Sequence, residues 1–201
     1  MRIAWFDAIM SNTTSQFEPA NAKVFRENLV QNPSPPVLWA GMATPIGNLV
    51  MQAESGALIS ANSNKSLRSV MGYPVPEWQR PIEWSDEECE RFIQSVYAGI
   101  FLGMFIYNDC FGSSKRLNGL LIDGQQRLHA IERYVKGELA VAGPDGVKYR
   151  WAELTGEEQA HFNRIPFNFE VVKINKEDEL KNLYNLFNYA GKPHTEAQRA
   201  T

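Results

Sequence analysis

The sequence predicts an α+β fold, and three observations support this prediction. Helical and extended patterns are mixed along the chain without the regular alternation that builds a doubly wound sheet. Capping-box patterns at residues 85–88 and 155–158 indicate helix starts. Short runs of branched, aromatic and other apolar residues at 101–108 and 167–174 are typical of strands.

Composition limits the class of protein and its partners. The chain has 201 residues, of which 44% are hydrophobic and 21% charged, which is typical of a globular protein with a buried core. The formal net charge of −3 gives no global attraction to nucleic acid. No apolar run approaches the ~20 residues that cross a bilayer, and Cys89 and Cys110 show no CxxC spacing. We therefore expect a cytoplasmic protein with no membrane partner.

The first 45 residues are weakly patterned, and we predict that they form an N-terminal extension to a domain at 46–201. Residues 20–30 are expected to form a short helix within this extension. Residues 48–60 predict a hairpin, because two apolar runs flank a turn at 54–56 that contains glycine.

The pattern becomes clearer after residue 73. Pro74 and Pro76 are expected to hold residues 75–78 extended. The elements that follow are, in order, a helix from 86 to about 98, a strand at 101–108, an exposed loop at 111–116, a strand at 117–122, a helix at 124–136, a short helix at 156–162, a strand at 167–174, and a last helix after Asn175 that buries Leu180, Leu183, Tyr184 and Phe187.

The best local candidate for chemistry is the segment from Asp123 to Arg127. A strand ends there, Gly124 gives room for a turn, and a helix begins, so unpaired backbone N–H groups and the positive end of the helix dipole form a phosphate site. Arg127 adds a forked donor that matches phosphate oxygens. Gln125 and Gln126 would supply amide donors, and Asp123 suits a Mg²⁺ ion or a sugar hydroxyl.

A structural explanation of the same segment stays open. Asp123 would then cap the helix, Gln126 would close a capping box, and Arg127 would be a solvated surface charge. The two explanations differ in where these three side chains point.

A second candidate is the stiff segment 75–84, which contains two tryptophans and the pair Gln79 and Arg80 between prolines. If the ligand is a triphosphate, as the family resemblance described below implies, it carries more charge than one helix terminus and one arginine neutralise. We therefore predict that Gln79 and Arg80 reach the same pocket. The alternatives are an ordered loop pinned by aromatic packing and a surface ion pair of Arg80 with Glu83 or Glu87.

Other catalytic motifs are missing from the sequence. The three histidines have no partners at metal-ligand spacing, so we expect no structural zinc site. The GxxxxGK[ST] phosphate loop and the GxSxG nucleophile elbow do not occur.

Four ordered segments resemble the DGQQR-motif family, the domain of unknown function family 262 of the ParB and sulfiredoxin-like superfamily. Residues 75–84 are similar to its IPxYQRxYxW opening, and residues 92–105 to its next helix and strand entry. Residues 121–128 match the DGQQR signature, and residues 186–195 resemble its FxxLNtgGtpLt segment. The family's tyrosine is Trp78 here, and the residues after Asn188 differ.

The resemblance implies a ParB/sulfiredoxin-like fold that binds and hydrolyses a nucleoside triphosphate with Mg²⁺. It gives Gly124 and Arg127 phosphate contacts, makes Gln125 and Gln126 orienting groups, and makes Asp123 a metal or catalytic carboxylate. It places Gln79, Arg80 and Asn188 in the nucleotide site as well.

Members of this family include restriction subunits of the GmrS type and phage proteins, so a role in restriction, anti-restriction or DNA modification is implied. Restriction members continue into a helical region and often a nuclease domain, and we do not expect the present chain to be a complete enzyme of that plan. DNA or a nuclease or defence protein is the partner that this analogy suggests.

Three other functions stay open. One is a nucleotide sensor without turnover, and another is a phosphotransferase. The third is a DNA-binding module with Arg68, Lys115, Arg116 and Arg127 as a local basic strip.

Overall fold

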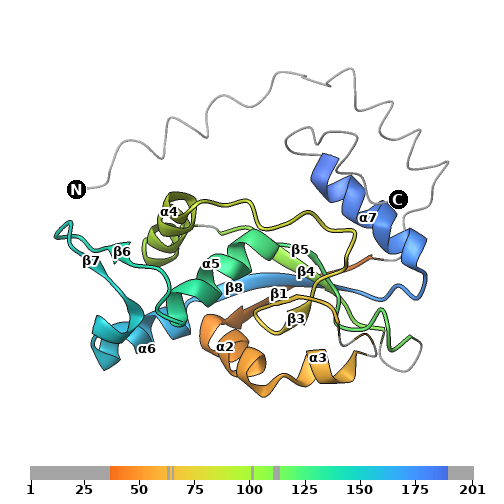
Figure 1. Ribbon diagram of the computed structural model, residues 1–201, viewed down its shortest axis with the longest axis horizontal. Coiled ribbons are helices and arrows are strands. Elements are labelled where there is room, and N and C mark those ends of the chain that lie inside the picture. Colours follow the sequence, from red (N-terminus) through yellow and green to blue (C-terminus); the bar gives the residue numbers. More distant parts are fainter. Residues whose placement is uncertain (1–36, 63, 65, 101, 111–113, 190–201) are drawn as a thin grey trace, which may run out of the picture. The chain divides into compact units, whose positions relative to one another are not determined.

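The computed structural model describes residues 37–62, 64, 66–100, 102–110 and 114–189, with the side chains of 37–41 and 189 left out (Figure 1). The chain divides into two units at Pro35–Pro36, and every described residue belongs to the second. The helix expected at residues 20–30 lies outside the described residues.

The second unit mixes helices and strands, which confirms the predicted α+β class. Its strands are β1 (Val37–Pro45), β2 (Ser69–Val70), β3 (Tyr73–Pro74), β4 (Met104–Asn108), β5 (Leu121–Asp123), β6 (Val141–Ala142), β7 (Lys148–Tyr149) and β8 (Pro166–Val172). Its helices are α2 (Ile46–Ser55), α3 (Ala57–Ala61), α4 (Asp86–Tyr97), α5 (Gln125–Val135), the 3₁₀ turn η1 (Trp151–Glu153), α6 (Gly156–Arg164) and α7 (Glu177–Tyr189).

The main sheet has the strand order β1-β8-β4-β5 (Figure 1). Strand β8 pairs parallel with β4 and antiparallel with β1, and β5 pairs antiparallel with β4. Strand β1 covers residues 37–45, which we predicted to lie in the extension, and it forms an edge of this sheet. The opposite edge is β5, the strand that ends at Asp123.

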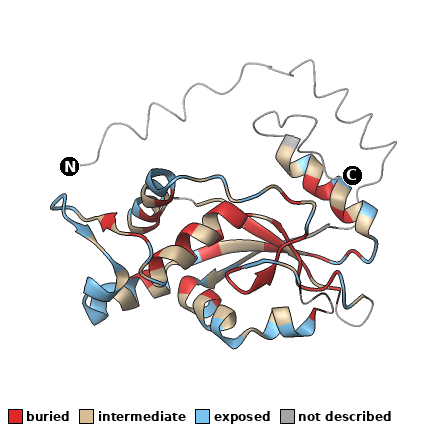
Figure 2. Ribbon diagram, viewed as in Figure 1, coloured by how far each residue is buried: buried red, intermediate tan, exposed pale blue. Residues whose placement is uncertain are grey.

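The sheet has an apolar cluster on each face, because successive side chains of a strand point to opposite sides. In β4, Phe105 joins a cluster that also contains buried residues of α2, α4, α5 and α6. Its neighbour Ile106 joins a second cluster with Leu180, Leu183 and Tyr184 of α7. Figure 2 shows the buried residues along the sheet and α5. None of the helices in the described part of the chain is long and apolar enough to span a membrane.

Helix starts follow the local sequence. The hydroxyl of Ser85 accepts a hydrogen bond from the N–H of Glu88, and the Glu88 carboxylate accepts one from the N–H of Ser85. Thr155 and Glu158 form the same reciprocal pair at α6. Both predicted capping boxes are therefore confirmed.

The hairpin predicted at 48–60 is wrong, because this segment forms helices α2 and α3. The turn was placed correctly at Gly56, which has a φ of 61° and ends α2. The flanking apolar residues have helical spacing, and Ile46 and Leu49 bury one face of α2. Two helices joined by a glycine produced the same pattern of apolar runs as a hairpin.

Other predicted elements are shorter than expected. Strand β4 begins at Met104 instead of residue 101, and turns occupy residues 115–119 ahead of β5. The segment expected to be extended at 75–78 bends, because the N–H of Gln79 donates to the carbonyl of Pro76 at 3.1 Å. Part of the expected loop at 111–116 lies outside the described residues.

One buried amide connects the ends of the central strands. Nδ2 of Asn108 donates to the carbonyls of Leu117 at 2.8 Å and Ile174 at 2.9 Å. Its Oδ1 accepts from the N–H of Ile174 at 2.9 Å, and the side chain is fully buried. The amide therefore satisfies backbone groups that the strands leave unpaired.

We expect Asn108→Leu to lower the free energy of unfolding by about 3 kcal/mol, because it leaves three backbone groups buried without partners. Chemical denaturation measures this loss. The control is Asn48→Ala on the exposed face of α2, which should stay within about 0.5 kcal/mol of the wild type. Equal stability of the two variants would show that the Asn108 amide has no special role.

Candidate functional site

The candidate site lies at the junction of β5 and α5. Gly124 separates the two elements and has a φ of 92°, a left-handed conformation that favours glycine. A Cβ atom at this position would lie 2.6 Å from the Cβ of Phe105 on β4. Glycine is therefore required both for the turn and for the close approach of β4.

One pocket lies at this junction, with a volume of about 80 Å³. The eight residues predicted from the sequence all line it, and Trp84, Ile122 and Tyr184 complete its wall. The eight are Gln79, Arg80, Asp123, Gly124, Gln125, Gln126, Arg127 and Asn188. The fold thus brings together segments that lie more than one hundred positions apart in sequence.

The N-terminus of α5 is open, in contrast to those of α4 and α6. Helices α4 and α6 have a capping box and acidic residues in the first turn. Helix α5 has neither a side-chain cap nor an acidic residue there. The explanation in which Asp123 and Gln126 cap this helix is therefore wrong, and the backbone N–H groups of its first turn are left for another partner.

Arg127 lies in the first turn of α5 and is not a solvated surface charge. Its Nη2 donates to the carbonyl of Met104 at 2.6 Å and to Oδ2 of Asp123 at 2.8 Å. Its Nε is buried without a hydrogen-bond partner in the described part of the chain. A positive side chain beside the positive end of a helix is unfavourable by itself, and the carboxylate of Asp123 is the anion that offsets it here. The N–H of Nε is the donor that this pair leaves open.

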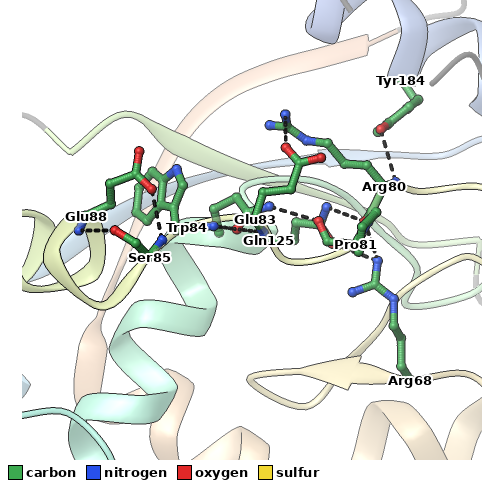
Figure 3. A network of polar contacts seen from close by, with 10 residues as sticks. Arg68, Arg80, Pro81, Glu83, Trp84, Ser85, Glu88, Gln125 and Tyr184 are labelled. Carbon is green, nitrogen blue, oxygen red and sulfur yellow. Dashed lines mark hydrogen bonds and ion pairs between the residues drawn. The ribbon is translucent and has the colours of Figure 1, made fainter. Parts of the chain in front are cut away.

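The two glutamines of the signature attach the segment 79–84 to α5. Oε1 of Gln126 accepts from the N–H groups of Glu83 at 3.1 Å and Trp84 at 3.2 Å, and its Nε2 donates to the carbonyl of Pro81. Nε2 of Gln125 donates to the carbonyl of Arg80 at 2.9 Å (Figure 3). Both side chains are buried, and they hold the two candidate segments together as one site.

Gln79 satisfies the open edge of β5. Its Nε2 donates to the carbonyl of Leu121 at 2.5 Å and to that of Ile122 at 3.0 Å. Both carbonyls belong to β5, the edge strand of the main sheet. The amide nitrogen of Gln79 therefore fixes the pocket wall, while contact of Gln79 with a ligand stays a prediction.

Arg80 lines the pocket, and its guanidinium forms the surface ion pair that we gave as the alternative. Nη1 of Arg80 lies 3.1 Å from Oε2 of Glu83, and both side chains are partly exposed. The backbone of Arg80 is held more firmly, because its carbonyl accepts hydrogen bonds from Nη2 of Arg68 at 2.7 Å and from Nε2 of Gln125 at 2.9 Å. The backbone of Arg80 is therefore fixed, whereas its guanidinium lies at the surface and can change partners.

Two aromatic residues complete the wall. The ring of Trp84 packs on Phe92 at a centroid distance of 5.5 Å, and the ring of Tyr184 packs on Trp78 at 5.2 Å. Burial raises the pKa of Tyr184 above its ordinary value, so its hydroxyl keeps its proton at neutral pH. The helical pattern of α7 placed Tyr184 in the core, but nothing local indicated its position at the pocket.

Asn188 reaches the pocket from the last described turn of α7. Its Nδ2 donates to the carbonyl of Tyr184 at 2.9 Å, one helical turn earlier. Asn188 and Tyr184 therefore belong to the same wall, which is provided by α7.

The four residues of the basic strip proposed for DNA binding differ in their surroundings. Arg127 is directed to Asp123, and Arg68 donates to the segment 79–84. Lys115 and Arg116 are exposed, and Arg116 pairs with Glu177. DNA binding by this strip stays a prediction. The described residues contain no group of three or more histidine, cysteine or acidic side chains that would hold a metal ion.

The fold and the pocket define a mixed α+β domain with an open helix terminus and two arginines at one cavity. Residues 57–198 match the family model described as the GmrSD restriction endonuclease, N-terminal domain. This match covers well over half of the chain, and the chain belongs to this family. Comparison with curated proteins and with solved structures found no match. The ParB/sulfiredoxin-like assignment stays a prediction.

We expect Gln126→Met to speed hydrogen exchange at the N–H groups of Glu83 and Trp84, because both lose their acceptor. A bond worth about 1 kcal/mol corresponds to a roughly fivefold faster exchange. Exchange measured by NMR tests this. Gln125→Met is the matched control, since Gln125 does not bond these N–H groups. Equal effects of the two substitutions would contradict the assigned contacts.

Proposed function

We propose that the pocket binds the phosphates of a nucleoside triphosphate together with Mg²⁺, and that the domain hydrolyses the terminal phosphate. The observation that carries this proposal is the uncapped start of α5 at a pocket that Arg127 and Arg80 also line. Backbone N–H groups, a helix dipole and two guanidinium groups are the donors that phosphate oxygens prefer.

Both arginines of the pocket are paired with a carboxylate, Arg127 with Asp123 and Arg80 with Glu83. In this proposal, a bound polyphosphate replaces these carboxylates as the partner of the arginines. The oxygens of the phosphates would take over the two guanidinium groups, and Asp123 would be released to a cation. Phosphate binding to Arg127 frees Asp123 for the cation, and cation binding to Asp123 frees Arg127 for phosphate. We therefore expect the nucleotide and Mg²⁺ each to bind more tightly when the other is present.

Asp123 fits the role of a Mg²⁺ ligand. Its side chain lines the pocket and stays 33% exposed while Oδ2 pairs with Arg127. Magnesium is commonly held by one or two carboxylates and the phosphates of the substrate, so a single aspartate suffices. When bound, the ion neutralises charge on the phosphate oxygens.

The pocket volume of about 80 Å³ is well below the roughly 300–1,000 Å³ typical of small-molecule pockets. In this proposal the pocket therefore holds phosphate groups and not a whole nucleotide. The nucleoside would then lie at the mouth, which the aromatic residues Trp84 and Tyr184 help to form. The hydroxyl of Tyr184, which keeps its proton, would donate to a phosphate oxygen.

In hydrolysis, a water oxygen forms a bond to the terminal phosphorus while the bond to the bridging oxygen breaks. The products are a nucleoside diphosphate and inorganic phosphate, and the two protons of the water pass to phosphate oxygen and solvent. Arg127 and the N–H groups of α5 would hold the negative charge that shifts to the leaving oxygen. Positioning and electrostatics therefore supply the catalysis.

Membership of a restriction endonuclease family supports a role in restriction or anti-restriction. In this proposal the nucleotide state of the pocket controls a nuclease or DNA-binding partner. A domain that binds nucleotide without turnover would act as a sensor for the same partner, and a phosphate-release assay distinguishes the two.

A thermal-shift screen of nucleoside mono-, di- and triphosphates, each with and without Mg²⁺, tests the proposed function. A ligand that binds only the folded state raises the apparent stability, by about 2.7 kcal/mol at a hundredfold excess over Kd. We expect the largest shift with a triphosphate and Mg²⁺ together. No shift with any nucleotide at millimolar concentration would contradict the proposal.

We expect Arg127→Ala to weaken triphosphate binding roughly tenfold to a hundredfold, because a charge-assisted hydrogen bond contributes about 1.5–3 kcal/mol. Calorimetric titration measures the loss. Arg133→Ala is the control, because Arg133 lies on the same helix and pairs with Asp86 at 2.7 Å away from the pocket. Unchanged affinity of Arg127→Ala would refute the role of Arg127.

We expect Glu83→Gln to tighten triphosphate binding about twofold to fivefold, because it releases Arg80 from an ion pair worth about 0.4–1 kcal/mol. Titrations of Glu83→Gln, Arg80→Met and the double variant form a cycle, and the gain should disappear when Arg80 is absent. Glu87→Gln, an exposed acid on α4, should change little. A gain that persists without Arg80 would show a general effect of charge instead.

A further inference from the structure

Arg68 lies outside the pocket wall and contacts the two groups that form it. Its Nη2 donates to the carbonyl of Arg80 at 2.7 Å and to Oε1 of Gln125 at 2.9 Å (Figure 3). The carbonyl of Gln79 lies at the limit of bonding distance, 3.5 Å from the same nitrogen. Arg68 itself does not line the pocket.

The guanidinium of Arg68, the side-chain amide of Gln125 and the carbonyl of Arg80 are joined pairwise by three hydrogen bonds, which form a triangle. Gln125 donates to the carbonyl of Arg80 at 2.9 Å, and the same carbonyl accepts from Arg68. Both lone pairs of the Arg80 carbonyl are therefore used. The amide of Gln125 has one donor and one acceptor in the triangle, which fixes its orientation.

We infer that Arg68 is a positioning residue, which holds Arg80 and the first residue of α5 at the distance that phosphate binding requires. This inference rests on the proposed function. The triangle fixes the backbone of Arg80 at its carbonyl. The hydroxyl of Tyr184 lies 3.5 Å from the N–H of Arg80, at the limit of bonding distance. The guanidinium of Arg80 can then exchange Glu83 for a phosphate without movement of its backbone.

The function of Arg68 is therefore to reduce the conformational entropy that the pocket loses when a ligand binds. A binding group that is already in place loses less conformational freedom when the ligand arrives. Without Arg68, the segment 79–84 keeps the bonds of Gln126 to Glu83 and Trp84 but loses its anchor at Arg80. We expect the fold to persist and the placement of Arg80 to become variable.

The test is calorimetric titration of a non-hydrolysable triphosphate analogue with Mg²⁺ against the wild type, Arg68→Met and Arg68→Lys. We expect Arg68→Met to weaken binding about tenfold and Arg68→Lys to recover part of the affinity, because its ammonium keeps the charge and can donate to both acceptors. Arg150→Met is the matched control, since Arg150 donates to the carbonyl of Gly137 at 2.7 Å away from the pocket.

A second comparison separates positioning from general stability. In the Arg80→Met background the loss caused by Arg68→Met should shrink, because Arg68 acts through Arg80. A loss of the same size in both backgrounds would overturn the inference, as would unchanged affinity of Arg68→Met. If Arg68→Met does not fold, Arg68→Lys gives the same comparison. A wild type that binds no nucleotide would remove the proposed function, and the inference with it.

Discussion

The site depends on the side-chain amides of Gln125 and Gln126, which bind the backbone of the segment 79–84 to the first turn of α5. Both amides are buried, and a buried amide without partners costs roughly 1–3 kcal/mol, so the segment and the helix order each other. The same contact places Arg80 at the pocket that Arg127 also lines. The two glutamines are thus structural, and the backbone N–H groups beneath them are the groups left for a ligand.

Gly124 adds a second constraint to this arrangement. Its left-handed conformation turns the chain from β5 into α5, and the lack of a side chain lets the turn pack against Phe105. An open helix terminus is therefore brought close to the edge of the sheet, where Asp123 and Arg127 face each other. A capping side chain at this point would occupy one of the first N–H groups of the helix and leave fewer of them to bind an anion.

Local features of the sequence predicted local structure well. The helix starts at Ser85 and Thr155 depend on side chains three residues away, and the turn at Gly124 depends on one glycine. The hairpin at 48–60 was predicted wrongly, because a glycine between two apolar runs fits two short helices equally well. Hydrogen-bond partners far apart in the chain could not be predicted from the sequence. Arg68 and Gln125 lie 57 positions apart, and the sequence indicated only that Arg68 is positively charged.

The composition of the pocket was predicted better than the roles of its residues. Resemblance to a family placed Gln79, Arg80 and Asn188 near the signature, and the fold brings them to one cavity. The amides expected to contact phosphate instead bond to backbone carbonyls. Hydrogen-bond partners depend on exact distances in the folded chain, so a residue type at a given spacing does not specify them.

The central claim is that the N-terminus of α5 receives phosphate. Backbone amide shifts in two-dimensional ¹H–¹⁵N NMR, recorded during titration with a non-hydrolysable triphosphate and Mg²⁺, test it most directly. We predict that the amides of Gln125, Gln126 and Arg127 shift most and saturate together. Saturating shifts confined to another surface, or no shift at millimolar ligand, would contradict the claim.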